Sequence, residues 1–162
     1  MTLMDAKEYD PRPKRRLMGL LGAAIVIAIL AWVGWLLFRY QPEKNVVNRM
    51  FDAIEAKDFE KAFAVYVADP DWKQHQDKYS SYPYNQFALD WGPSGDFGPI
   101  TVHKIVCAAE PPKQGFQAPS GVVVMVRINN RADPRDDVAL WVEKKTRTVN
   151  ASPVRLDCKG AG

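Results

Sequence analysis

Apolar residues are arranged in three different patterns along this chain. Residues 17–38 form an uninterrupted run of 22 residues without a charge, proline, asparagine or glutamine. Across residues 43–66, apolar positions recur every three or four residues, as they do on one face of an amphipathic helix. From residue 100 onward, short runs rich in β-branched residues alternate with turn-forming segments, which is typical of strands. The pattern predicts one long apolar helix, then amphipathic helices, then a β-sheet.

The apolar run is long enough to cross a lipid bilayer. A helix of 22 residues spans about 33 Å, and the hydrocarbon core is roughly 30 Å thick. The run exceeds the roughly 7 to 15 residues of a signal-peptide core, and no small-residue cleavage site follows it. Four basic residues lie within residues 12–16 and two within residues 39–44, which predicts a cytoplasmic N-terminus. We therefore expect a cytoplasmic basic tail at residues 1–16 and an uncleaved transmembrane signal anchor at residues 17–38.

Two amphipathic helices and one shorter helix are expected after the anchor. The first covers Glu43–Lys57. Its apolar face consists of Val46, Val47, Met50, Phe51 and Ile54. Asp58 is a suitable N-cap for a second helix, which ends before Asp69-Pro70. The apolar face of this second helix consists of Phe59, Phe63 and Tyr66. A third helix is expected near Tyr84–Trp91, within an aromatic-rich stretch that turn residues interrupt.

The C-terminal third of the chain predicts an antiparallel meander. The β-rich runs are Ile100–Ala109, Gly121–Asn129, Asp137–Lys144 and a less regular fourth run, Thr148–Arg155. Residues 122–126 are continuously apolar, which predicts a central strand covered on both faces. Pro153 places the last run at an edge, because proline cannot donate to the ladder. We expect an α+β fold in which an N-terminal transmembrane helix precedes helices packed on a curved antiparallel four-stranded meander sheet.

The charge distribution argues against nucleic-acid binding. The chain has 22 basic and 19 acidic residues, and residues 1–39 contain six of the basic and three of the acidic ones. The remaining residues therefore hold 16 of each sign, so the domain at residues 41–162 is close to neutral. A nucleic-acid-binding domain carries a basic patch or stripe instead. We exclude nucleic acid as a partner.

Several sequence blocks beyond the anchor match the pattern of a known superfamily. They comprise the apolar positions of the first helix, Lys57-Asp58-Phe59, Ala62, Tyr66, Phe87-Ala88-Leu89-Asp90-Trp91-Gly92, Gly98-Pro99-Ile100 and Ser152-Pro153. Over about residues 43–156 the chain resembles the nuclear transport factor 2-like superfamily, in particular its membrane-anchored bacterial members. The resemblance implies a cone-like α+β domain at residues 41–162. It leaves the activity open, because the superfamily includes isomerases, cyclases, dehydratases and domains without a known reaction.

The resemblance implies where an acid or base would lie if the domain were an enzyme. Reactive members of the superfamily use Asp, His or Tyr in the open end of the cone. Asp90 and His103 are the candidates for a base, and His75 and the tyrosines at 66, 79, 82 and 84 are also available. Asp90 lies at an expected helix end, where a turn-capping role explains it equally well. The sequence pairs none of these residues, so no catalytic residue is assigned.

The aromatic stretch between residues 72 and 97 is a candidate binding surface. Trp72, Tyr84, Phe87 and Trp91 are the candidates for lining a pocket at the mouth of the cone. The alternative is that these rings belong to the hydrophobic core, since helices on one face of a sheet need large side chains to cover it. Both interpretations stay open at the level of sequence.

Cys107 and Cys158 are the only cysteines. The predicted topology places both outside the cytoplasm, where disulfides persist, so we expect them to be bonded. Two unrelated thiols are the alternative, because sequence does not reveal whether their Cα atoms lie within about 7 Å. Two distant cysteines and two histidines are too few for a structural metal site, and we expect neither metal nor cofactor.

These observations lead to one expected function and one alternative. We expect a single-pass protein of the bacterial inner membrane, with a cytoplasmic N-terminus and a periplasmic C-terminal domain that binds or scaffolds without catalysis. The expected partners are the lipid bilayer and another envelope membrane protein, and a homodimer is a further hypothesis. The alternative is a small isomerase-like or lyase-like enzyme that uses the cone pocket, with Asp90 or His103 as base.

Overall fold

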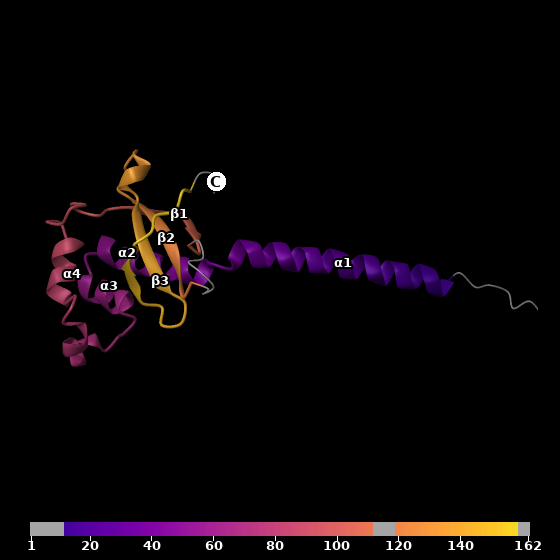
Figure 1. The fold of residues 1–162 in the computed structure, drawn as a ribbon, viewed down its shortest axis with the longest axis horizontal. Coiled ribbons are helices and arrows are strands. Elements are labelled where there is room, and N and C mark those ends of the chain that lie inside the picture. The colour runs from indigo at the N-terminus through magenta and orange to yellow at the C-terminus, as the bar shows by residue number, and fades with distance from the viewer. Residues whose placement is uncertain (1–11, 112–118, 159–162) are drawn as a thin grey trace, which may run out of the picture. The chain divides into compact units, whose positions relative to one another are not determined.

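The computed structural model describes residues 12–111 and 119–158 (Figure 1). The described chain divides into two units, with the boundary between Arg39 and Tyr40. The first unit contains α1, Arg12–Phe38, which is long and apolar enough to cross a membrane. Its large apolar side chains from Leu20 onward are exposed. The predicted apolar helix is therefore confirmed, and it begins five residues before the apolar run because the basic residues ahead of the run are also helical.

The second unit begins with two helices, α2 at Gln41–Glu55 and α3 at Phe59–Tyr66. Pro42 lies in the first turn of α2, where a missing backbone N–H costs nothing. The helix ends earlier than predicted because Lys57 adopts a left-handed conformation with φ of 59°. Asp58 then caps α3, and its carboxylate accepts a hydrogen bond from the Lys61 backbone N–H at 3.0 Å. Both predicted helices are confirmed.

The segment after α3 contains short helical turns that the pattern did not predict. Two 3₁₀ turns, η1 at Trp72–Gln74 and η2 at Gln76–Tyr79, precede α4 at Tyr84–Asp90. Pro83 adopts an extended conformation and starts α4. The short third helix is thus confirmed. The 3₁₀ turns are too brief to produce a hydrophobic period.

Four antiparallel strands form one open sheet in the order β1-β2-β3-β4. They are β1 at His103–Ala109, β2 at Gly121–Ile128, β3 at Val138–Glu143 and β4 at Val149–Ala151. A 3₁₀ turn, η3 at Pro134–Asp136, lies between β2 and β3. The predicted meander and the edge position of the last strand are confirmed. β4 is shorter than predicted, because after Ser152 donates to the Ala139 carbonyl at 3.0 Å, Pro153 has no N–H to continue the ladder.

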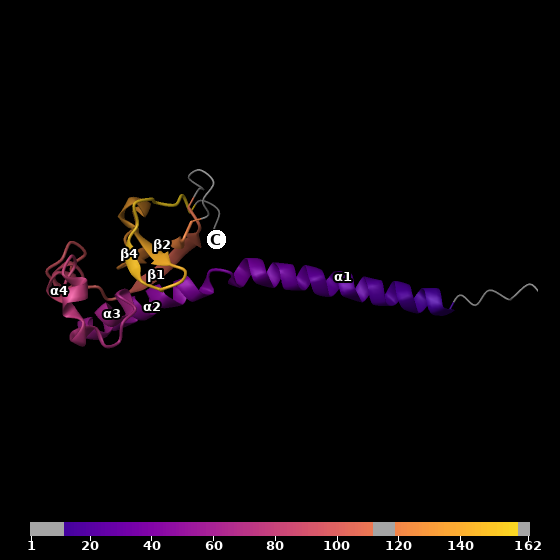
Figure 2. The same cartoon turned by 60° about the horizontal axis from the view of Figure 1, so that its bottom comes forward.

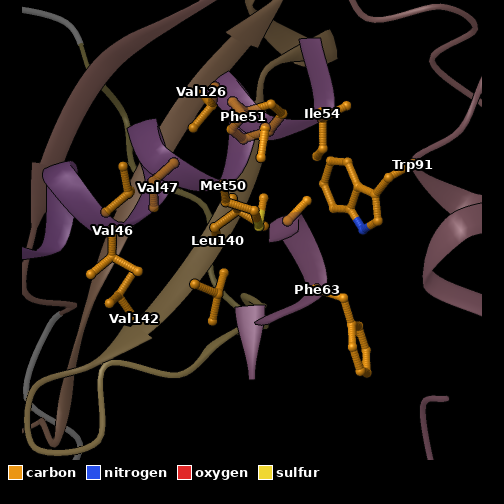
Figure 3. Packing of buried hydrophobic residues seen from close by; sticks show 14 of the residues in the cluster. Val46, Val47, Met50, Phe51, Ile54, Phe63, Trp91, Val126, Leu140 and Val142 are labelled. Carbon is orange, nitrogen blue, oxygen red and sulfur yellow. The ribbon is translucent and has the colours of Figure 1, made fainter. Parts of the chain in front are cut away.

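The main hydrophobic core lies between the helices and one face of the sheet. Figure 2 shows α2 and α3 on the same side of the strands. In Figure 3, the side chains of Val47, Met50 and Phe51 on α2 point toward Val126 on β2 and Leu140 on β3. All five are 0 to 1% exposed. Burying such a side chain stabilises the fold by roughly 1.5–3 kcal/mol, so this layer fixes the helices on the sheet.

The opposite face of the sheet is covered by the C-terminal segment. A register shift between Ile105 and Cys107 turns the Cys107 side chain to the face away from α2, where it is paired with Met125. Cys107 forms a disulfide with Cys158, with the Cα atoms 5.9 Å apart. The chain after β4 therefore returns across the sheet to β1, on the side away from α2 (Figure 2). Val123 and Met125 of β2 are 0% and 2% exposed on this face, which confirms the prediction of a central strand covered on both faces.

Candidate functional site

A cavity of about 650 Å³ lies between the α3 and α4 region and the β3–β4 edge of the sheet. The volume is within the roughly 300–1,000 Å³ range of small-molecule sites. The wall is formed by Tyr66, Tyr82, Leu89, Asp90, Trp91, Ser94, Gly95, Asp96, Phe97, Val138, Ala139, Leu140 and Ala151. We call this space the Asp90 cavity. It combines aromatic rings, aliphatic side chains and a small number of polar groups, which is the composition of a ligand pocket.

Asp90 is held in this wall by two side-chain hydrogen bonds. The Tyr82 hydroxyl donates to Asp90 Oδ2 at 2.8 Å, and the Gln86 amide donates to Asp90 Oδ1 at 2.6 Å. Gln86 lies one turn earlier on α4, so the helix itself aligns this second donor. A carboxylate has about four acceptor positions, so both oxygens keep room for a further partner. The two bonds orient the carboxylate without saturating it.

The loop that follows Asp90 packs tightly on the end of α4. A Cβ atom on Gly95 would collide with the Asp90 carbonyl oxygen, and one on Gly92 would collide with the Ala88 carbonyl oxygen. The loop also closes on itself, since the Gly95 N–H donates to the Gly92 carbonyl at 3.0 Å. Two glycines are required here by close approach to the backbone. They bring Phe97 back against Trp91, with ring centroids 5.6 Å apart, and so close one wall of the Asp90 cavity.

The electrostatic environment keeps the two tyrosines of the cavity protonated. Burial, followed by the hydrogen bond to Asp90, raises the pKa of the Tyr82 hydroxyl well above its usual value. Burial and the charge of Asp90 also raise the pKa of Tyr66. Both hydroxyls are therefore hydrogen-bond donors over the physiological pH range. Among the described residues, no Lys, Arg or His side chain forms an ion pair with Asp90.

The four predicted pocket residues lie in three different places. Trp91 lines the Asp90 cavity. Trp72 and Tyr84 stack with ring centroids 5.0 Å apart and line a second, smaller cavity of about 240 Å³. Phe87 is fully buried in the core. The aromatic stretch therefore contributes both to the core and to cavity walls.

His103 lies apart from the Asp90 cavity, at the start of β1, with its side chain packed against α2. Its ring is 10% exposed and stacks on Phe51 with centroids 5.2 Å apart. Nδ1 lies 2.6 Å from Glu55 Oε1, and Nε2 lies 3.1 Å from Asn48 Oδ1. Both nitrogens are thus occupied by side chains of α2. This arrangement fastens the helix to the first strand.

The His103 cluster also contains the residues that could hold a cation. Ligand atoms of Asp52, Glu55 and His103 lie within 4.8 Å of one another. Three ligands suit a site that keeps one position open, but both His103 nitrogens already have hydrogen-bond partners. His75, the other histidine, is exposed, with Nδ1 3.0 Å from Asp69 Oδ2. The structure therefore does not bring Asp90 and either histidine into one site.

Sequence reasoning missed the sheet side of the Asp90 cavity. Val138 and Leu140 of β3 and Ala151 of β4 line it, yet nothing in their local pattern distinguishes them from other strand residues. It also missed Asn48 and Glu55 as partners of His103. One feature of the sequence could have indicated these partners: residues 48, 52 and 55 are spaced so that they lie on one face of a helix. Comparisons with protein-family models, with curated proteins and with solved structures give no match to this chain.

Proposed function

We propose that this chain is a membrane-anchored, non-catalytic domain that binds a small molecule outside the cytoplasm. The observation that carries the proposal is the Asp90 cavity, about 650 Å³ in volume, with aromatic and aliphatic walls and an oriented carboxylate. Such a cavity can enclose most of a small ligand and hold it by one polar contact. Binding needs only this cavity, whereas catalysis would also need paired reactive groups.

The proposed location is the bacterial inner membrane, with α1 as a single transmembrane anchor. Its length and composition support this assignment. The basic residues at positions 12–16, at the start of α1 and ahead of its apolar run, favour a cytoplasmic N-terminus and a periplasmic C-terminal domain. The disulfide between Cys107 and Cys158 supports the same side, because disulfides persist in oxidising compartments. Only two residues separate α1 from α2, so an anchored domain would meet ligands and partners close to the bilayer.

A scaffolding role toward another envelope membrane protein is part of the same proposal. An anchor confines the domain to the membrane surface and raises its effective concentration toward membrane partners. We also propose membership of the nuclear transport factor 2-like superfamily, supported by helices that precede a four-stranded antiparallel meander. Pairing of two copies into a homodimer is compatible with this assignment.

The proposal is tested by purifying the full-length protein from its native membrane in detergent. Mass spectrometry of the small molecules and proteins that co-purify is the measurement. We expect a bound small molecule in the wild type that is lost when Ala151→Trp, at an exposed position of the cavity wall, fills the Asp90 cavity. Lys145→Ala, on the turn between β3 and β4, is the matched control and retains it. A preparation that fractionates without the membrane contradicts the anchor, and equal ligand recovery from the Ala151→Trp variant contradicts the cavity.

A second candidate function is supported by the position of Asp90. Its carboxylate faces a cavity that also contains the protonated hydroxyls of Tyr66 and Tyr82. A small isomerase or lyase needs a base and a hydrogen-bond donor in one such space. His103 supports this candidate less, because it does not line the Asp90 cavity and its side chain is bound to Glu55 and Asn48 of α2. Turnover of a co-purified ligand that Asp90→Asn abolishes would favour the enzyme over the binding domain.

A further inference from the structure

We infer that the ligand of the Asp90 cavity is an organic cation: a protonated amine or quaternary ammonium carried on an aromatic or aliphatic body. This inference rests on the proposed binding function and specifies its ligand class. Three features of the cavity support it: the sign of its charge, the nature of its walls and the geometry of Asp90.

The charge of the cavity is negative. Of the residues that the structure describes, those lining the cavity include Asp90 and Asp96 but no Lys, Arg or His. Asp90 is half-buried and accepts hydrogen bonds only from neutral donors among the residues that the structure describes. A partly buried carboxylate without a cation is unfavourable, and an ammonium group of a ligand would compensate it. An anionic ligand would instead meet two like charges.

Arg131 contacts two residues of this wall, Asp96 and Phe97. Its guanidinium lies 5.7 Å from the Phe97 ring centroid and donates to the Asp96 and Phe97 carbonyls at 3.5 and 3.3 Å. Arg131 does not line the Asp90 cavity. Its contacts hold the Phe97 ring in the wall, where the ring stacks on Trp91.

The aromatic walls favour the same ligand class. Tyr66 and Tyr82 contribute one pair of rings, with centroids 5.5 Å apart, and Trp91 contributes a third ring. Phe97 already interacts with Arg131 and Trp91 and serves as an apolar wall. Aromatic faces attract ammonium groups, and sets of such rings around one space recognise quaternary ammonium ligands. The aliphatic side chains of β3 offer a surface for the uncharged body of the ligand.

The geometry of Asp90 adds directionality. Tyr82 and Gln86 each occupy one acceptor position, so the remaining positions have a fixed orientation. Both of these donors are neutral, so neither supplies a positive charge to the carboxylate. A ligand ammonium therefore meets a pre-oriented acceptor, which reduces the ordering cost of binding.

The test compares three probes with one body and different charge. They are (1-naphthylmethyl)trimethylammonium, neutral 1-naphthylmethanol and anionic 1-naphthylmethanesulfonate. Binding to the full-length protein in lipid nanodiscs is measured by isothermal titration calorimetry, with empty nanodiscs subtracted. We expect the ammonium probe to bind about tenfold or more tighter than the alcohol, and the sulfonate to bind more weakly than either.

Two variants in the cavity wall and one control outside it assign this preference to the cavity. Asp90→Asn keeps the shape of the side chain and removes its charge, so the ammonium and alcohol probes should bind within about twofold of each other. Asp136→Asn makes the same charge change on η3, outside the cavity, and should retain the preference. Tyr66→Leu keeps an apolar wall without a ring, and should weaken the ammonium probe more than the alcohol. This last variant tests the inference even if Asp90→Asn does not fold.

The possible outcomes distinguish the inferred ligand class from the proposed binding function. If the alcohol binds as tightly as the ammonium probe, the cation inference is wrong and the binding function stands. A preference that survives both Asp90→Asn and Tyr66→Leu also overturns the inference, because the cation would then be recognised elsewhere. If none of the three probes binds at millimolar concentration, the cation inference is overturned and the cavity loses its support as a binding site.

Discussion

At the level of single residues, two tyrosine–aspartate hydrogen bonds connect the segments before and within α4. The Tyr79 hydroxyl donates to Asp69 Oδ2 at 2.7 Å, and the Tyr82 hydroxyl donates to Asp90 Oδ2 at 2.8 Å. Hydrogen bonds to charged acceptors are stronger than those between neutral groups. Each pair requires a protonated phenol, and burial together with the carboxylate raises the pKa of both tyrosines. The pairs are therefore sensitive to alkaline pH.

We predict that the protein loses stability as the pH rises from about 10 to about 12. Burial and Asp69 raise the pKa of Tyr79 from 10.0 to about 12. The folded chain then holds this proton more tightly than the unfolded chain, so the stabilisation is complete below pH 10 and lost as the pH passes about 12. The measurement is urea unfolding at a series of pH values.

The variants Tyr79→Phe and Asp69→Asn identify the source of this pH dependence. Tyr79→Phe removes the titrating group, so its free energy of unfolding should fall less steeply over the same range. In Asp69→Asn the phenol remains, and ultraviolet titration should show its pKa shifted downward. A wild-type stability that stays constant up to pH 12 would contradict the raised pKa values.

At the level of elements, one β-bulge in β1 determines where the C-terminal segment is attached to the sheet. Without the register shift between Ile105 and Cys107, side chains at 103, 105 and 107 would share one face of β1. The shift keeps His103 on the helix side and turns Cys107 to the other side, where Cys158 reaches it. Arg155 fastens the same segment, because its guanidinium donates to the Asp137 carbonyl at 2.6 Å. The bulge thus allows the chain to cover both faces of β2.

We predict that Cys158→Ser destabilises the protein by up to about 4 kcal/mol while leaving the fold in place. The disulfide closes a loop with a sequence separation of 51 residues, and the chain-entropy model gives roughly this value for such a loop. The core under α2 does not involve the C-terminal segment, so folding should persist. Urea unfolding and far-ultraviolet circular dichroism measure the two effects.

A reducing agent provides the control for this prediction. It should lower the stability of the wild type to that of Cys158→Ser and leave the variant unchanged. Equal stability of the oxidised wild type and the variant would mean that the disulfide does not constrain the chain.

At the level of the whole molecule, the chain separates into a long apolar helix and a folded domain. The boundary falls between Arg39 and Tyr40. Tyr40 packs against the core of the domain, and Glu43, which is 4% exposed, pairs with Arg147 on the turn between β3 and β4. The first turn of α2 therefore belongs to the domain.

We predict that residues 40–162 fold without α1. Their core is made within the domain, so the melting temperature should agree with that of the full-length protein in detergent to within about 2 °C. A chain that starts at residue 46 should melt at a clearly lower temperature, because it leaves Arg147 without its buried carboxylate partner. Differential scanning calorimetry gives both values. Failure of residues 40–162 to fold would mean that α1 contributes to the domain.

The elements that sequence alone determined are those built from local interactions. The apolar run, the stripes of α2 and α3, the Asp58 cap and the alternating strands each depend on residues within a few positions of one another. Backbone propensity and side-chain period act at this range, so these elements could be predicted. The disulfide could also be predicted, because the chain offers only one pair of cysteines.

Which residues form the candidate site was determined only by the tertiary structure. Tyr66, Asp90 and Leu140 line one cavity although they are far apart in sequence, and His103 pairs with Glu55 rather than with Asp90. Which side chains meet across a core depends on strand register and helix packing, and a shift of one residue in a strand reverses its faces. The bulge at Cys107 is such a shift, and no local pattern of apolar residues encodes it.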